Sequence, residues 1–373
     1  MRSRSWPLLA LSSLLCACAT VSDPPAAALT RVDHYVTLKS SAPALAGGET
    51  RLYVREITPA AGSTVAKAGR VVLFIHGGAW PGSTAYDLPL GDASWMRYLA
   101  NAGYHAFALD FTGYGASTRP KPMTDPCNLP EALQKQLVPA LLPAPCPPSH
   151  ADHVTTLESE WEEIDAVVDH VRKLRGADKV AIVASSRGGP RSVGYVLRHP
   201  DKVSRIFALA PAYRRTWPLQ APKSDAGPVR AMSKQGLEEN WDTQLGCPGQ
   251  VAPGVRDAVW TDVIASDPLG QGWGVGLRFL PALNYGINRE TVKAIRVPIA
   301  MVVGAHDKVV VPARVRNFYE DVGSPEKVFV DLACASHYAM WEANRGLLFK
   351  ASLEWIRDGQ VNGIGRGETR LGY

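Results

Sequence analysis

Short apolar runs alternate with amphipathic segments along most of the chain. The run Val71–Ile75 is continuously apolar and rich in β-branched residues, which is typical of a strand buried on both faces. It ends abruptly at His76-Gly77-Gly78. Similar runs predict further strands at residues 104–109, 179–184, 205–209, 299–303 and 328–332.

Helical spacing is clearest between residues 155 and 175. Apolar side chains recur there every three or four positions, with Glu gathered at the beginning and Arg and Lys at the end, before Gly176. This pattern predicts an amphipathic helix whose charges match its dipole. A second helix is expected at residues 92–101. Because strands alternate with helices, the sequence predicts a mainly parallel sheet covered by helices on both faces.

The composition is that of a globular protein, with 46% hydrophobic and 20% charged residues among 373. The net charge of +5 comes without a run of Lys and Arg that could follow a phosphate backbone, so we expect no nucleic-acid partner. The chain is rich in Gly, Pro and Trp, with 33, 29 and 10 residues, which indicates long ordered loops and an aromatic-lined surface.

The first residues have the layout of an export signal. Arg2 and Arg4 precede an apolar run at residues 6–15, which is too short to span a bilayer. The segment Leu15-Cys16-Ala17-Cys18 resembles a bacterial lipobox, so we expect residues 1–17 to be removed and Cys18 to be lipidated. The alternative is ordinary signal peptidase cleavage at residues 17–19, which would leave a secreted or periplasmic soluble protein.

Two further features bear on localisation. Ala19 follows the lipobox cysteine, and by resemblance this favours the outer membrane over retention at the inner one. We therefore expect a bacterial cell-envelope protein that contacts the membrane through its lipid anchor. Residues 18–30 are rich in Pro and Ala and are expected to form a tether.

Export changes how the cysteines are interpreted. Once Cys16 is removed and Cys18 carries lipid, an even number remains in an oxidising compartment, which predicts two disulfides. Four cysteines allow three pairings. We favour Cys127 with Cys146, because both lie in one Pro-rich insertion, which leaves Cys247 for Cys334. We expect no metal, since the chain lacks C-x-x-C and H-E-x-x-H spacings, and no cofactor.

A candidate nucleophile lies where the strand at residues 179–184 ends. Ala184-Ser185-Ser186-Arg187-Gly188 has small residues two positions before and after Ser186, the pattern of a nucleophile elbow between a strand and a helix. Centring the motif on Ser185 would place Val183 and Arg187 at the positions that must be small. Ser186 is therefore the predicted nucleophile, although such strings also occur as simple Gly-rich turns.

A serine hydroxyl near its ordinary pKa needs a neutral imidazole to accept its proton and a carboxylate to orient that imidazole. Asp307 follows the strand expected at residues 299–303, and His337 follows the last expected strand. The order Ser, acid, His along the chain fits this arrangement. Asp331 is an alternative acid and His306 an alternative base.

Stabilisation of an oxyanion requires two N–H donors, most often from the backbone. Arg187 would supply one at the beginning of a helix, whose dipole adds to the effect. Gly78 would supply the other, because glycine lets the backbone approach closely. The Arg187 side chain could attract an anionic substrate group or form a salt bridge within the fold, and we favour the salt bridge.

Taken together, these motifs resemble those of the α/β-hydrolase superfamily of serine esterases and lipases. The resemblance includes Asp110-x-x-Gly113-x-Gly115-x-Ser117 and covers residues 71–340. It implies an α/β-hydrolase fold with a mainly parallel eight-stranded sheet. The departures are Ala184 in place of the usual Gly and Ala79 in place of a third Gly, and the second leaves the oxyanion donor open.

We expect one catalytic domain at residues 31–358, with insertions at about 117–153 and 214–289, and a mobile tail at 359–373. The second insertion is the expected cap over the active site. Its aromatic side chains could line an acyl pocket or form the cap's own core: Trp217, Trp241, Trp260, Trp273, Phe279 and Tyr285.

The sequence thus predicts a serine hydrolase that cleaves carboxylic esters of small molecules through an acyl-enzyme on Ser186, with His337 as base and Asp307 as orienting acid. The acyl group of the substrate could be apolar or aromatic. A peptidase or amidase with the same triad is one alternative. A catalytically silent binding protein of the envelope is another.

Overall fold

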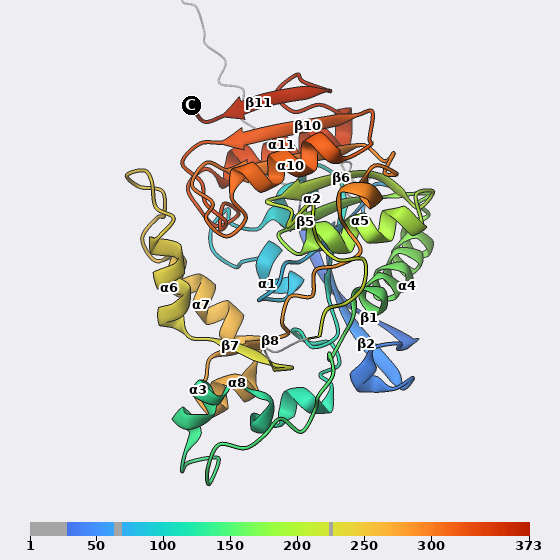
Figure 1. Cartoon of the computed structure of the whole chain (residues 1–373). Coiled ribbons are helices and arrows are strands. Elements are labelled where there is room, and N and C mark those ends of the chain that lie inside the picture. The colour runs from blue at the N-terminus through green and yellow to red at the C-terminus, as the bar shows by residue number, and fades with distance from the viewer. Residues whose placement is uncertain (1–27, 63–68, 224–226) are drawn as a thin grey trace, which may run out of the picture.

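The structure, a computed structural model, describes residues 28–62, 69–223 and 227–373. Residues 1–17 and the predicted lipidation site Cys18 lie outside this range. The described chain forms a nine-stranded sheet in the order β1-β2-β4-β3-β5-β6-β9-β10-β11 (Figure 1). The strand bounds are β1 Leu29–Lys39, β2 Glu49–Pro59, β3 Val71–Ile75, β4 His105–Asp110, β5 Val180–Ser185, β6 Val203–Leu209, β9 Ile299–Gly304, β10 Lys327–Leu332 and β11 Gly367–Leu371.

The centre of the sheet is parallel and buried. Only the β1–β2 and β2–β4 pairs are antiparallel within this sheet. β3, β4, β5 and β9 are buried at every residue, as continuous apolar runs between two helical layers should be. The carboxyl ends of these parallel strands therefore meet at one edge, where the candidate site residues follow them.

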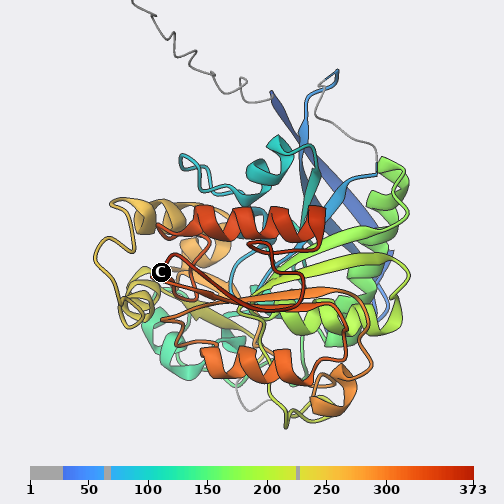
Figure 2. The same ribbon diagram turned by 90° about the horizontal axis from the view of Figure 1, so that it is seen from above.

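Helices cover both faces of the sheet. α11 (Arg345–Asp358) lies on one face and α10 (Pro312–Asp321) on the other (Figure 2). α2 (Trp95–Asn101) packs on α11, where the rings of Trp95 and Phe349 stack at 5.1 Å. α4 (Leu157–Arg175) packs on α5 (Gly188–Arg198). None of the helices in the described ranges is long and apolar enough to cross a membrane.

The helix expected at residues 155–175 is α4. A capping box between Thr156 and Ser159 begins it, and Gly176 in the left-handed conformation ends it. The helix expected at residues 92–101 begins later, at Trp95, because the Ser94 side chain caps it by accepting a hydrogen bond from the Arg97 amide.

Three sequence predictions at the edges of the sheet were wrong. The sheet has nine strands and not eight, and β1 already begins inside the predicted tether. Residues 367–371 of the predicted mobile tail form β11, which pairs in parallel with β10. These edge strands were not predicted because main-chain hydrogen bonds hold an edge strand, and such bonds do not require a particular pattern of side chains. β11 has the sequence GETRL and buries no side chain fully, so no apolar run marks it.

The two predicted insertions are built of short elements. The first contains η2 Lys121–Thr124, η3 Pro126–Asn128, α3 Glu131–Gln134 and η4 Lys135–Leu137. The second contains β7 Arg230–Met232, α6 Lys234–Asp242, α7 Val255–Ala265, α8 Pro268–Trp273, β8 Leu277–Phe279 and α9 Arg289–Val292. β7 and β8 form a separate antiparallel pair, which lies close to α8 on one side of the main sheet (Figure 1). Two other short elements complete the chain, η1 Pro43–Leu45 and α1 Gly82–Tyr86.

Candidate active site

Ser186 occupies a strained turn between β5 and α5. Its φ is +53°, in the left-handed region that side chains other than Gly, Asn and Asp seldom adopt. The turn is held from both sides: the Ser186 amide donates to the Leu209 carbonyl at 2.9 Å, and its carbonyl accepts from the amides of Gly189 and Ala212, each at 2.9 Å. Such strain persists only where the surrounding structure enforces it, which is common at active sites.

The small residues around Ser186 are required by close packing. A Cβ on Gly188 would lie 2.3 Å from the Ile75 carbonyl oxygen, and one on Gly77 would lie 3.1 Å from Ser186 Cβ. Ser185 Oγ is engaged elsewhere, 2.8 Å from the buried Tyr86 hydroxyl. The strand-to-helix turn expected from the sequence is therefore present, and it is centred on Ser186.

His337 and Asp307 meet beyond the ends of two neighbouring strands. Asp307 follows β9, and His337 follows β10. His337 Nδ1 lies 2.8 Å from Asp307 Oδ2, and the other carboxylate oxygen accepts from the amides of Val309 and Val310 at 2.9 and 2.8 Å. Because the carboxylate is held in this way, it orients the imidazole so that Nε2 is left to exchange a proton.

The alternative acid and base lie elsewhere. Asp331 is within β10, partly exposed, and pairs with Arg370 at 3.5 Å. His306 points its Nε2 towards Cys247 Sγ, 3.6 Å away. Neither residue lines the cavity that contains Ser186.

Ser186 and His337 line the same cavity, which has a volume of about 620 Å³. Gly77, Gly78 and Arg187 also line it, just beyond the ends of β3 and β5. In the described part of the chain, the amides of Gly78 and Arg187 donate no hydrogen bond to other protein groups. A Cβ on Gly78 would meet nothing within 4 Å, so this predicted oxyanion donor lies beside open space.

The cap also contributes side chains to the cavity lining. Trp217, Phe279 and Leu280 line the cavity. Trp241 and Tyr285 instead belong to the core: Trp241 packs on Tyr338 with ring centroids 4.5 Å apart, and the Tyr285 hydroxyl accepts from the Leu157 amide at 3.0 Å. Trp260 and Trp273 are half-buried outside the cavity. The two roles that the sequence left open for these aromatics are thus divided among them.

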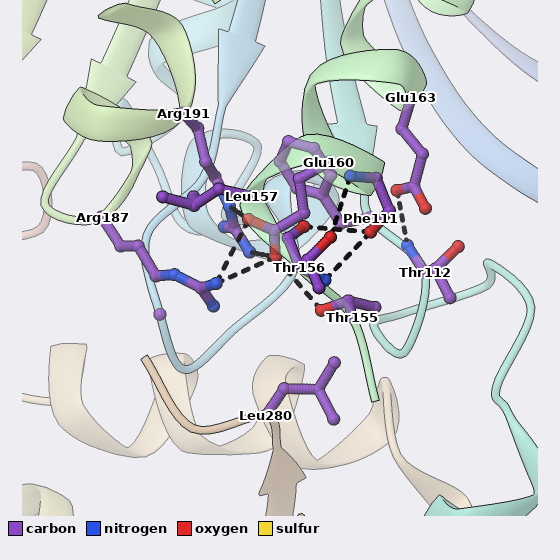
Figure 3. Close-up of polar contacts among 12 residues, drawn as sticks. Phe111, Thr112, Thr155, Thr156, Leu157, Glu160, Glu163, Arg187, Arg191 and Leu280 are labelled. Atoms are coloured by element: carbon purple, nitrogen blue, oxygen red, sulfur yellow. Dashed lines mark hydrogen bonds and ion pairs between the residues drawn. The ribbon is translucent and has the colours of Figure 1, made fainter. Parts of the chain in front are cut away.

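The Arg187 side chain forms the expected salt bridge. Its Nη2 lies 3.1 Å from Glu160 Oε1, and both side chains are buried (Figure 3). Arg191 contacts the same carboxylate at 2.8 Å. Burial acts to raise the pKa of Glu160, but the charges of Arg187 and Arg191 outweigh it, so the pKa lies below its ordinary value.

Glu163 lies one helical turn further along α4. Burial raises its pKa to about 7, against a hydrogen bond from the Thr112 amide at 3.0 Å that favours the ionised form. The nearby charge of Glu160 adds to the increase. Near neutral pH this carboxyl is therefore only partly ionised.

Both predicted disulfide pairings are confirmed. Cys127 bonds to Cys146 and Cys247 to Cys334. The second bridge joins the cap to the loop that carries His337. Within the described ranges, no three His, Cys, Asp or Glu side chains gather as a metal ion would require.

Two residues that hold the His337 loop carry no sequence signal. Gln244, from the cap, accepts from the amides of Lys308 and His337 through its Oε1, at 3.1 and 3.2 Å. The Glu342 carboxylate accepts from the Trp241 indole and from the Ser336 amide, each at 2.7 Å. They were missed because a polar residue in a loop or short turn looks the same in sequence whether it is solvated or buried.

Comparison with known proteins agrees with this geometry. The family Hydrolase_4, described as Serine aminopeptidase, S33, matches residues 66–344. The chain belongs to this family. It is thus a serine hydrolase of the α/β-hydrolase superfamily, and the fold expected from the sequence motifs is confirmed, apart from its ninth strand. No curated protein matches the chain.

Several solved structures resemble this chain. The serine hydrolase of carbazole degradation called CarC is 17% identical, with a TM-score of 0.53 over 88% of this chain and 99% of that one. A thermophilic esterase from Thermogutta terrifontis is 16% identical, with a TM-score of 0.54 over 87% of this chain and 98% of that one. A serine hydrolase from Cycloclasticus zankles is 13% identical, with a TM-score of 0.54 over 88% of this chain and 99% of that one. At these identities the likeness concerns the fold.

Proposed function

We propose that this protein hydrolyses carboxylic esters through an acyl-enzyme on Ser186, with His337 as general base and Asp307 as orienting acid. The observation that carries the proposal is the His337–Asp307 hydrogen bond beside the same cavity as the strained Ser186. Nucleophile, base and orienter are the groups that acyl transfer needs, and they occur here in the chain order of the superfamily.

The reaction follows from these positions. The Ser186 hydroxyl attacks the ester carbonyl while its proton passes to His337 Nε2, and Asp307 stabilises the imidazolium that forms. The amides of Gly78 and Arg187 receive the developing oxyanion. His337 then gives the proton to the leaving alcohol, and the ester bond breaks to leave an acyl-serine. Water, deprotonated by His337, attacks the acyl-serine in the second half, and the carboxylic acid leaves as Ser186 recovers its proton.

An aminopeptidase reaction is the second candidate, because the family description names it. A free α-amino group is protonated near neutral pH and needs a carboxylate to hold it. Among the described residues, the cavity lining contains no Asp or Glu but three arginines, Arg187, Arg214 and Arg314. This charge distribution favours the esterase over the aminopeptidase.

We also propose that the protein is exported and carries lipid on Cys18, which would place it at the outer membrane. The layout of residues 1–18 supports this, and so do the two disulfides, which are typical of oxidising compartments. Metabolic labelling with a radioactive fatty acid should label the wild-type protein and not Cys18→Ser. Equal absence of label from both, with a soluble mature form, would favour the signal peptidase alternative.

Fluorophosphonate labelling tests the catalytic proposal directly. We expect one adduct on Ser186, located by mass spectrometry, and none in Ser186→Ala. The wild type should hydrolyse para-nitrophenyl esters and not the matching aminoacyl anilides, while Ser186→Ala loses turnover with nearly unchanged melting temperature. Absence of any adduct would favour a silent binding protein, and turnover of anilides would favour the aminopeptidase.

A further inference from the structure

The Arg187 guanidinium is only partly used by the fold. Its side chain is 3% exposed, and its Nη2 atom contacts Glu160. In the described part of the chain its Nε and Nη1 atoms have no hydrogen-bond partner. Figure 3 shows every dashed line from Arg187 running to Glu160. Buried N–H donors without acceptors are costly and rare, so these two atoms call for an explanation.

Glu160 does not depend on Arg187 for its pairing. Arg191 already holds both carboxylate oxygens, with Nε 2.9 Å from Oε2 and Nη2 2.8 Å from Oε1. Arg191 also donates to the carbonyls of His76 and Gly77, at 2.9 and 2.7 Å. Arg187 is therefore the second cation on a single carboxylate that is already satisfied.

The positive charges of the arginines at the cavity exceed the negative charges around them. The charge of Glu163 also acts on Arg191, but burial raises the pKa of that carboxyl to about 7. Arg187 lines the cavity together with Ser186, as do Arg214 and Arg314, and no acidic residue of the described chain does so. A concave, poorly solvated site lined by one sign of charge attracts ligands of the opposite sign.

A further polar atom at the cavity lacks a partner. Asn284, in the loop after β8, also lines the cavity, and its buried Oδ1 has no donor among the described residues. The apolar side chains of Phe279 and Leu280 line the same cavity. The lining thus combines apolar side chains with a few polar groups, which is the usual composition of a small-molecule binding site.

We propose that Arg187 binds an ionised carboxyl group of the substrate, so that the natural substrates are esters whose acid or alcohol part carries a second, anionic carboxylate. The inference rests on the proposed esterase function and names its substrate class. Either the Nε or the Nη1 atom of Arg187 would donate to the carboxylate, since the two atoms lie on different edges of the guanidinium, while the Arg187 backbone amide keeps its separate place at the oxyanion. Charge-assisted hydrogen bonds from a guanidinium are among the strong ones that a carboxylate forms in a protein.

Two matched pairs of esters test the substrate class and its source. On the acyl side, para-nitrophenyl hydrogen glutarate is compared with para-nitrophenyl methyl glutarate. On the alcohol side, para-butanoyloxybenzoate is compared with its methyl ester. Since a hydrogen bond to a charged group discriminates by roughly 10- to 100-fold, we expect the anionic member of one pair to have the higher kcat/KM by that factor. The pair that shows it identifies which part carries the carboxylate.

Substitutions assign the preference to Arg187. Arg187→Gln should bring the ratio of the two kcat/KM values close to one, mainly through the KM of the anionic ester, and Arg187→Lys should restore part of it. Arg316→Gln is the matched control: Arg316 is partly exposed on α10, pairs with Glu368 and is absent from the cavity lining. Its ratio should equal that of the wild type. A ratio near one in the wild type, for both pairs, would overturn the inference even if Arg187→Gln failed to fold.

A binding measurement separates this inference from the proposed function. Calorimetry with Ser186→Ala should detect glutarate binding that is at least ~10-fold tighter than that of dimethyl glutarate and that is lost when Arg187→Gln is added. If both members of each pair are cleaved equally well and glutarate does not bind, the esterase proposal holds and the carboxylate site is wrong. This result is expected if ordered water satisfies the Arg187 side chain. Glutarate binding without fluorophosphonate labelling would keep the site and remove the esterase.

Discussion

The disulfide between Cys247 and Cys334 joins the cap to the loop that carries His337, across 87 residues of sequence. On the loop side the bridge lies three residues before His337, and the Cys247 sulfur faces the His306 imidazole next to Asp307. Gln244 and Glu342 hold the same loop by hydrogen bonds, as described above. The position of the imidazole is therefore tied to the cap as well as to the sheet.

Removing this bridge should lower both stability and activity. The double variant Cys247→Ser with Cys334→Ser should lose about 4–5 kcal/mol of unfolding free energy, from the loop closed by 87 residues. The matched control is Cys127→Ser with Cys146→Ser. It removes a bridge that closes only 19 residues and should lose about 3 kcal/mol of unfolding free energy. Urea unfolding measures both. We expect kcat to fall in the first variant only; equal kcat in the two would show that the bridge does not position His337.

Asp307→Asn should reduce kcat by roughly 10²- to 10⁴-fold, because an amide cannot hold the imidazole in the required tautomer or stabilise its charged form. Stability should change little, since the amide oxygen can still accept from Val309 and Val310. Asp331→Asn is the control, because Asp331 pairs with Arg370 on the partly exposed edge of the sheet. Steady-state kinetics on one ester compares them. A larger loss in Asp331→Asn would transfer the orienting role to that residue.

Glu163 should make the protein less stable as the pH rises. Its pKa is about 7 in the folded chain, against 4.5 ordinarily, so between these values the folded state holds a proton that the unfolded state has released. The free energy of unfolding then falls through this window, by about 3 kcal/mol at full effect. Glu163→Gln removes this contribution, and its stability relative to wild type should rise from pH 4.5 to pH 7 and then level off.

The control for this titration is Glu162→Gln, on the exposed side of the same helix. Urea unfolding at a series of pH values measures both variants. A difference from wild type that stays flat for Glu163→Gln would mean that the buried carboxyl titrates at its ordinary pKa.

Gly188→Ala should destabilise the elbow by about 1–3 kcal/mol or more, because the added methyl would lie 2.3 Å from the backbone oxygen of Ile75. Hydrolytic activity should fall with it, since Gly188 lies two residues after Ser186 in the same turn. Gly78→Ala is matched in chemistry but meets nothing within 4 Å, so its unfolding free energy should stay within about 0.5 kcal/mol of the wild type. Thermal unfolding distinguishes the two, and equal melting temperatures would contradict the packing argument.

Much of the central fold was predictable because its signals are local. The strand Val71–Ile75 is apolar at every position because both faces are covered, and the elbow around Ser186 needs small residues within two positions. The positions of Asp307 and His337 follow from the strands that precede them. In each case a short stretch of sequence contains the physical requirement, either burial on both faces or close packing at a turn.

The edges of the sheet and the supports of the site were not predictable in this way. β11 has no apolar run, because main-chain pairing with β10 holds it. Nothing in the sequence separates Trp217, which lines the cavity, from Trp241, which is buried against Tyr338. These differences depend on contacts between segments far apart in the chain.

By itself, then, the sequence determined the alternation of strands and helices, the turn at Ser186 and the order of Ser186, Asp307 and His337, because each depends on neighbouring residues. Only the tertiary structure decided that Arg187 and Arg191 share one carboxylate from α4, and that two buried nitrogen atoms of Arg187 find no partner among the described residues. Charge balance in a buried site is a sum over segments that meet only after folding.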